Sequence, residues 1–74
     1  MPTPTIATTT AEAGATFRAA REGAGLSVRA LARESGIDHS TISRWERGER
    51  EISPATYEHL SLTLAHYLAG RWAA

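Results

Sequence analysis

Hydrophobic residues recur at helical spacing along most of the chain, beginning with a run of alanines around one phenylalanine. The inward positions of this first predicted helix are Ala13, Phe17, Ala20 and Ala24. Thr9 and Glu12 have the spacing of a capping box, so we expect the helix to begin near Thr9. Gly23 and Gly25 predict its end.

Two short amphipathic stretches follow, and Gly36 separates them. Ser27 is a suitable N-cap for the first, which we expect to run to about Ser35 and to end at a left-handed Gly36. Its inward positions are Val28, Leu31 and Ala32, and its outward positions are Arg29, Arg33 and Glu34. Asp38 can cap the second stretch, and Gly48 predicts its end. The inward positions of this second stretch are Ile42 and Trp45.

A longer apolar stretch begins at Ser53 and Pro54, a cap followed by proline at the first helical position. We expect this fourth helix to run to Ala69 and to end at Gly70. One of its two apolar stripes consists of Leu60, Leu64, Tyr67 and Leu68, and the other of Leu62, Ala65 and Ala69. No segment alternates like a β-strand, so the predicted fold class is all-α, with four helices and an extended fourth helix.

The first ten residues, MPTPTIATTT, contain too few apolar side chains to offset the entropy of ordering them. We therefore predict a flexible N-terminal arm over residues 1–10 and one domain over residues 11–74. The chain has no cysteine and no apolar run long enough to span a membrane. These features favour a soluble protein of the cytoplasm.

The charges are balanced overall, with eight basic and eight acidic residues. Arginine accounts for all eight basic residues, and residues 17–50 contain seven of them against five acids. The excess of positive charge in this region is small, so we expect any affinity for DNA to depend only moderately on salt.

The two short stretches have the layout of a helix-turn-helix, in which a glycine turn lets the second helix protrude. Ala32 lies four residues before Gly36, where a larger side chain would push the helices apart, and Ile37 can fill the turn. An acid-free polar stripe on the second stretch consists of His39, Ser40, Ser43, Arg44 and Arg47. Such a face suits the major groove of DNA, although a simply solvated helix face is the alternative.

Residues 17–64 resemble the lambda-repressor-like helix-turn-helix family, also called the Xre or Cro type. The matching segments are GLSVRALARESGIDHSTISRWERGER and SPATYEHLSLTL. The resemblance implies a compact four-helix domain that binds double-stranded DNA. It implies base-reading roles for His39, Ser40 and Arg44, and phosphate contacts for Thr41, Ser43 and Arg47. It also implies an ion pair between Arg21 and Glu46, for which an exposed surface pair of little energetic value is the alternative.

The chain departs from the family in two places. The family usually has a phosphate-binding glutamine where this chain has Val28, so that contact is either missing or supplied by Ser27 or Arg29. Arg50 completes the set of phosphate candidates. After Leu64 the family usually turns into a fifth helix, whereas AHYLAGRWAA predicts a continuation of the fourth helix followed by a short aromatic tail.

The resemblance therefore implies no dimer surface, and the apolar side chains of the fourth helix provide the candidates. These are Leu62, Tyr67, Leu68 and Trp72. They predict a two-fold homodimer that places two recognition helices about 34 Å apart on a palindromic site. The alternative is that Leu62 and Trp72 cover the first helix or the N-terminal arm.

No pattern of catalytic or metal-binding residues accompanies these features. His59 and His66 lie seven residues apart without a third ligand, and His39 has no partner nucleophile or carboxylate pair. We expect no enzyme activity, metal, cofactor or small-molecule ligand. The resemblance implies the function of a Cro-like or repressor-like regulator in the cytoplasm of a bacterial cell or a phage-infected host, which would place its third helix in the major groove of an operator. The alternatives are a protein-interaction module, such as an antitoxin or adaptor, and a recombination directionality factor.

Overall fold

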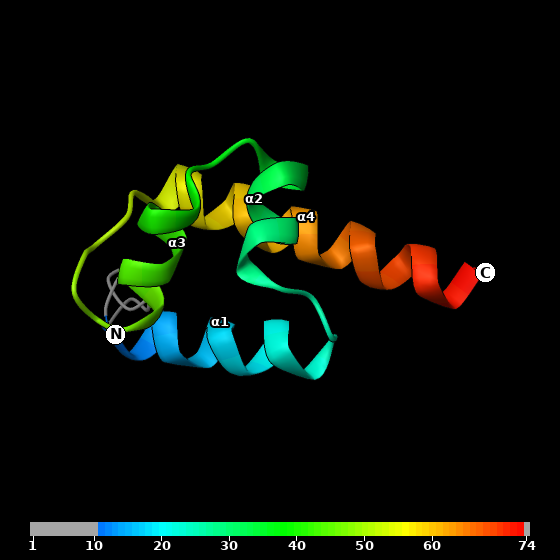
Figure 1. Ribbon diagram of the computed structural model, residues 1–74, viewed down its shortest axis with the longest axis horizontal. Helices are drawn as coiled ribbons and strands as arrows, with labels where there is room; N and C mark the ends of the chain where they lie inside the picture. The colour runs from blue at the N-terminus through cyan, green and yellow to red at the C-terminus, as the bar shows by residue number, and fades with distance from the viewer. Residues whose placement is uncertain (1–10, 74) are drawn as a thin grey trace, which may run out of the picture.

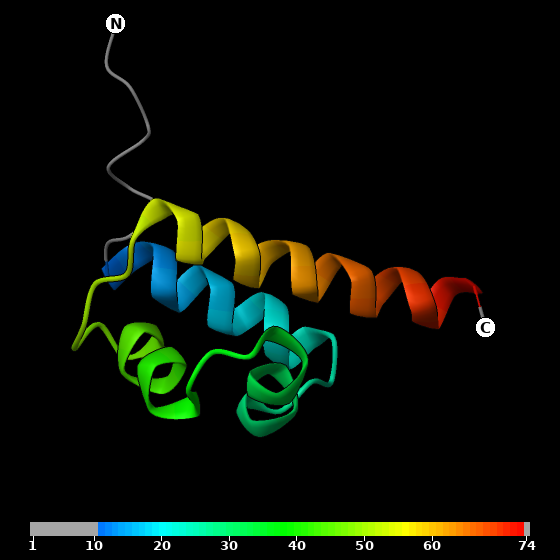
Figure 2. The same cartoon turned by 90° about the horizontal axis from the view of Figure 1, so that it is seen from above.

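The computed structural model describes residues 11–73, with side chains as far as residue 70. It contains four helices: α1 (Ala11–Gly23), α2 (Val28–Ser35), α3 (His39–Glu46) and α4 (Pro54–Ala73). α3 packs against α1 and α2, and α2 also packs against α4 (Figure 1). The far end of α4 extends past the other helices in both views (Figures 1 and 2). The all-α prediction and the long fourth helix are confirmed over these residues.

Local signals at the ends of α2 and α3 set the turn between them. The Ser27 hydroxyl accepts a hydrogen bond from the Ala30 amide at 3.0 Å and caps α2. Gly36 ends α2 with a left-handed φ of 76°, and its amide donates to the Ala32 carbonyl. The Asp38 carboxylate accepts hydrogen bonds from the first amides of α3. These three predicted boundary residues are confirmed.

The core is built around Trp45, which is fully buried on the inner face of α3. Its ring lies 5.1 Å from that of Phe17 on α1 and 5.8 Å from that of Tyr57 on α4, measured between centroids. The other buried apolar residues are Ala24, Leu26, Leu31, Ile42, Ile52, Leu60 and Leu64. Trp45 therefore joins three helices, and its burial fixes which side of α3 is turned outward.

α1 and α3 approach closely at Gly14. A methyl group at this position would overlap the backbone carbonyl oxygen of Trp45 and would lie 3.2 Å from the Cα of Glu46. Gly14 is buried, and the absence of a side chain lets the backbones touch. The sequence analysis did not identify this requirement.

The inward face of α1 was predicted wrongly in one position. Ala20 is exposed, and the buried residues of α1 are Gly14, Phe17 and Arg21, at steps of three and four. The face is shifted because a glycine and a charged arginine, which a hydrophobicity pattern assigns to the surface, occupy core positions. The predicted start at Thr9 lies outside the described residues.

The predicted end of α4 at Ala69 was also wrong, because the helix continues through Gly70 to Ala73. Glycine ends a helix when it adopts a left-handed conformation, and Gly25, Gly36 and Gly48 do so whereas Gly70 does not. The start of α4 follows the prediction, since the Ser53 hydroxyl accepts a hydrogen bond from the Thr56 amide at 3.1 Å.

Candidate nucleic-acid interface

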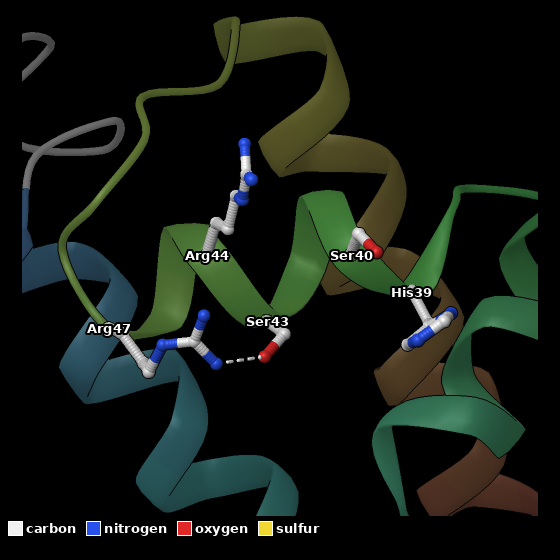
Figure 3. Close-up of a pocket in the computed structure, with 5 residues that line it drawn as sticks. All are labelled: His39, Ser40, Ser43, Arg44 and Arg47. Carbon is white, nitrogen blue, oxygen red and sulfur yellow. Dashed lines mark hydrogen bonds between the residues drawn. The ribbon is translucent and has the colours of Figure 1, made fainter.

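The outward face of α3 gathers the polar stripe into a shallow hollow. This hollow, of about 240 Å³, is lined by His39, Ser40, Ser43, Arg44 and Arg47 (Figure 3). Ser40, Arg44 and Arg47 are exposed, and His39 and Ser43 are half-buried. The structure thus brings together all five residues of the stripe on a surface that faces away from Ile42 and Trp45.

A buried ion pair fixes the inner side of the same helix. Arg21 donates from Nε and Nη2 to the two carboxylate oxygens of Glu46, at 2.8 and 2.9 Å. Its Nη1 donates to the Leu26 carbonyl at 2.7 Å. Only 7% of Arg21 and 5% of Glu46 are exposed. The hydrogen bond from Arg21 to Glu46 raises the pKa of Arg21, so the guanidinium keeps its charge inside the domain.

A second arginine–glutamate pair lies on the outer side, and the sequence analysis did not identify it. Arg47 donates from Nε and Nη2 to the carboxylate of Glu49 at 3.0 and 3.1 Å. Its Nη1 donates to the Ser43 hydroxyl at 2.6 Å (Figure 3). The hydrogen bond with Arg47 lowers the pKa of Glu49 and raises that of Arg47. No acidic residue belongs to the polar stripe itself. In the folded protein, however, the Glu49 carboxylate neutralises Arg47, one of the two arginines of the stripe.

The consecutive residues Arg47, Gly48 and Glu49 are the local pattern from which this ion pair could have been predicted. Gly48 has a φ of 78°, a conformation that turns the chain back toward α3. The Glu49 amide then donates to the Arg44 carbonyl at 2.8 Å, which ties residue 49 to the last turn of the helix. An acid directly after such a glycine lies within reach of the arginine before it.

The remaining phosphate candidates are not among the residues that line the hollow. Arg29 and Arg50 are exposed, Thr41 is half-buried, and the Ser27 hydroxyl is engaged in capping α2. A second hollow, of about 110 Å³, lies beside the first and shares Ser43 and Arg47 with it. Its lining residues are Arg18, Arg21, Val28, Ser43, Glu46 and Arg47.

Val28 stands at the position where the family usually has a glutamine. It lines this second hollow together with three arginines. The sequence analysis did not single out Arg18, which is exposed and pairs with Glu22 at 3.1 Å.

The dimer candidates of α4 differ in exposure. Leu62 is 53% exposed and is the only exposed large hydrophobic residue that the structure describes. Tyr67 and Leu68 are half-buried and pack against the core, and the side chain of Trp72 lies outside the described part. An apolar groove between α1 and α4 is lined by Thr16, Phe17, Ala20, Tyr57, Ser61, Leu64, Ala65 and Leu68.

The histidines of α4 are exposed. His59 Nε2 lies 2.7 Å from the Ser35 carbonyl oxygen at the end of α2. Within residues 11–73, no three histidine, cysteine or acidic side chains are grouped so that they could hold a metal ion. No helix in this part of the chain is both long and apolar enough to cross a membrane.

The fold and the exposed face of α3 define a small helix-turn-helix domain. The chain matches the family described as Helix-turn-helix over residues 17–69, a span that reaches from the middle of α1 into the last turns of α4. It therefore belongs to the helix-turn-helix family of the Xre or lambda-repressor type, and it is a DNA-binding regulator. No curated protein and no solved structure matched the chain.

Proposed function

We propose that this protein is a sequence-specific transcriptional regulator of the Cro or repressor type, which inserts α3 into the major groove of an operator. The observation that carries the proposal is the polar hollow on α3. Its side chains face outward because Ile42 and Trp45 on the opposite side are fully buried. A helix anchored in this way presents its polar face as a rigid unit, as major-groove recognition requires.

Arg44 is the principal base-reading residue in this proposal. It is exposed, and no described residue holds its guanidinium in an ion pair, so both edges of the fork are available for guanine O6 and N7. His39 and Ser40 lie in the first turn of α3, where short side chains can approach base edges.

Phosphate contacts position the helix in the groove and add affinity without sequence preference. We assign them to Ser43 and Arg47, which line the hollow, and to four residues that do not line it: Ser27, Arg29, Thr41 and Arg50. Arg29 and Arg50 are exposed, which suits this role.

We further propose that two copies associate through α4 on a palindromic operator. The exposed stripe of Leu62, Ala65 and Ala69 supports this part of the proposal. It runs beside the apolar groove between α1 and α4, so the two together form a continuous apolar surface. Burying Leu62 in a two-fold contact would remove the largest described apolar exposure from water.

Selection from random duplexes, followed by gel shift of the recovered sequence, tests the central proposal. Arg44→Ala should lose about 1–3 kcal/mol of discrimination at one base position, while Arg33→Ala should bind as the parent does. Arg33 is a matched control because it is an exposed arginine on the neighbouring helix and lies outside the hollow. Recovery of no preferred sequence would contradict the proposal.

A protein-interaction module, such as an antitoxin or adaptor, is the second candidate function. The apolar groove and Leu62 favour it, because the same surface would receive a different protein instead of a second copy. Sedimentation with and without the selected duplex separates the two. A dimer that Leu62→Glu abolishes and Ala55→Glu leaves intact supports the operator-bound dimer, whereas a monomer under both conditions contradicts it.

A further inference from the structure

Arg47 is one of two arginines in the hollow on α3, yet in the free protein its charge is already engaged. Glu49 accepts hydrogen bonds from Nε and Nη2 of Arg47 at 3.0 and 3.1 Å. Both side chains are about half exposed, at 49% and 53%, so the pair lies at the surface where DNA would approach. Among residues 11–70, Glu49 is the only acid whose carboxylate forms an ion pair with a residue lining this hollow on its open side.

Glu49 occupies one edge of the Arg47 guanidinium. A carboxylate that accepts from Nε and Nη2 takes an edge that a phosphate could otherwise bind through two hydrogen bonds. Nη1 also donates to the Ser43 hydroxyl at 2.6 Å, so three of the five N–H groups of Arg47 are engaged. A phosphate can therefore take the Nε–Nη2 edge only by displacing Glu49.

The position of Glu49 is built into the backbone. The left-handed Gly48 and the hydrogen bond from the Glu49 amide to the Arg44 carbonyl hold residue 49 against the end of α3. Arg47 lies in the same turn, so the carboxylate stays close to the guanidinium even after the hydrogen bonds break. Its effective concentration at this site is consequently high.

We propose that Glu49 is an internal competitor for DNA phosphate, which occupies Arg47 in the free protein and is displaced from it when DNA binds. This inference rests on the proposed placement of α3 against DNA. Displacement leaves the Glu49 carboxylate beside the phosphate backbone, where like charges repel. Glu49 thus lowers affinity for every duplex while leaving the base preference set by Arg44 unchanged.

The competitor is present throughout the neutral pH range. Because Arg47 lowers the pKa of Glu49 below its ordinary value, the carboxylate stays charged in the free protein. At neutral pH, Glu49 therefore lowers the affinity for DNA and the salt dependence of that affinity by a constant amount.

Dissociation constants of Glu49→Gln across a salt series test the proposal. Glu51→Gln is the matched control, since it removes the same charge from the same exposed loop, at a residue without an ion pair in the structure. Each variant is measured with the selected duplex and with a scrambled duplex of equal composition. At low salt Glu49→Gln should bind both duplexes about two- to fivefold more tightly than the parent, and Glu51→Gln less than about 1.5-fold more tightly.

The salt series and measurements on an Arg47→Ala background show how far the effect of Glu49 depends on Arg47. The slope of log affinity against log salt should steepen by up to about 1 for Glu49→Gln, because Arg47 no longer exchanges one anion for another. On an Arg47→Ala background, the advantage of Glu49→Gln over Glu51→Gln should shrink to the part that comes from repulsion between the Glu49 carboxylate and DNA phosphate.

Two results would overturn the inference. Equal affinities for Glu49→Gln and Glu51→Gln on the parent background would show that the ion pair has no influence on binding. Weaker binding by Glu49→Gln would show that the carboxylate positions Arg47 for DNA instead of competing for it. Equal binding to selected and scrambled duplexes would contradict the proposed sequence-specific function alone, because competition for phosphate acts on any sequence.

Discussion

Two arginine–glutamate pairs lie on opposite sides of α3, and they share the same two-pronged hydrogen-bond geometry. Arg21 and Glu46 are almost completely buried, whereas Arg47 and Glu49 are about half exposed. The acid of the first pair and the arginine of the second are neighbours in sequence, so one peptide unit separates an inward from an outward role. Burial, rather than pairing chemistry, therefore decides what each pair does.

In the buried pair neither charge can return to water without opening the domain. The pair also satisfies the Leu26 carbonyl through Arg21, so it ties α1, the following loop and α3 together. In the exposed pair water replaces either partner at little cost. We therefore assign the first pair to stability and the second to the charge of the DNA-facing surface.

Glu46→Ala should have the largest effect on the buried side of this comparison. It leaves the Arg21 guanidinium buried without its carboxylate partner, which typically costs about 3–5 kcal/mol. In a domain of this size such a loss approaches the total stability, so we expect a large fall in the thermal midpoint followed by circular dichroism. Glu49→Ala is the exposed counterpart and should melt within about 2 °C of the parent. A Glu46→Ala midpoint within a degree or two of the parent would refute the structural role of the buried pair.

Gly14→Ala should have the next largest effect, because it disturbs the contact that places α3 next to Arg21. The added methyl overlaps the Trp45 carbonyl oxygen, a backbone atom that cannot swing away. We expect a loss of about 1–3 kcal/mol in urea unfolding. At Gly23 no atom lies within 4 Å of an added methyl group, so Gly23→Ala should be neutral or slightly stabilising. Equal stabilities for the two variants would argue against the close approach of α1 and α3.

The smallest predicted effect concerns the exposed pair in acid. Arg47 holds the pKa of Glu49 below its ordinary value of 4.5 in the folded protein. A lowered folded pKa contributes stability above the unfolded pKa, and this contribution is lost as pH falls through the folded value. The difference between the urea midpoints of the parent and Glu49→Gln should therefore be small at pH 7 and should shrink as the pH falls below 4.5. A difference that grows in acid would contradict the sign.

The sequence predicted the parts of the fold that depend on local chemistry. Ser27, Gly36 and Asp38 act within three or four residues of their own positions, so their roles can be predicted without knowing the rest of the fold. Ile42 and Trp45 follow from helical periodicity. The polar hollow on α3 follows in turn, because it is the side opposite these two residues.

The features that were missed depend on contacts between distant segments, on an unusual residue at a core position, or on the backbone conformation of a glycine. Gly14 is required only because α3 crosses α1 at that residue, and no local pattern reveals the crossing. Arg21 occupies a core position that a hydrophobic pattern assigns to Ala20. Glu49 reaches Arg47 only because Gly48 reverses the chain. Gly70 was expected to end α4, but glycine carries no signal that distinguishes a helical from a left-handed conformation.

Titration of the isotope-labelled protein with the selected duplex, followed by amide chemical shifts, tests most directly whether α3 is the DNA-reading helix. The account predicts that the largest shift changes fall on residues 39–47 and on the neighbouring arginine side chains of the hollow. Leu62, Ala65 and Ala69 lie in the proposed dimer contact on α4, so their amides shift as well when two copies associate on the duplex. Largest changes on α4, with α3 unaffected, would contradict the account.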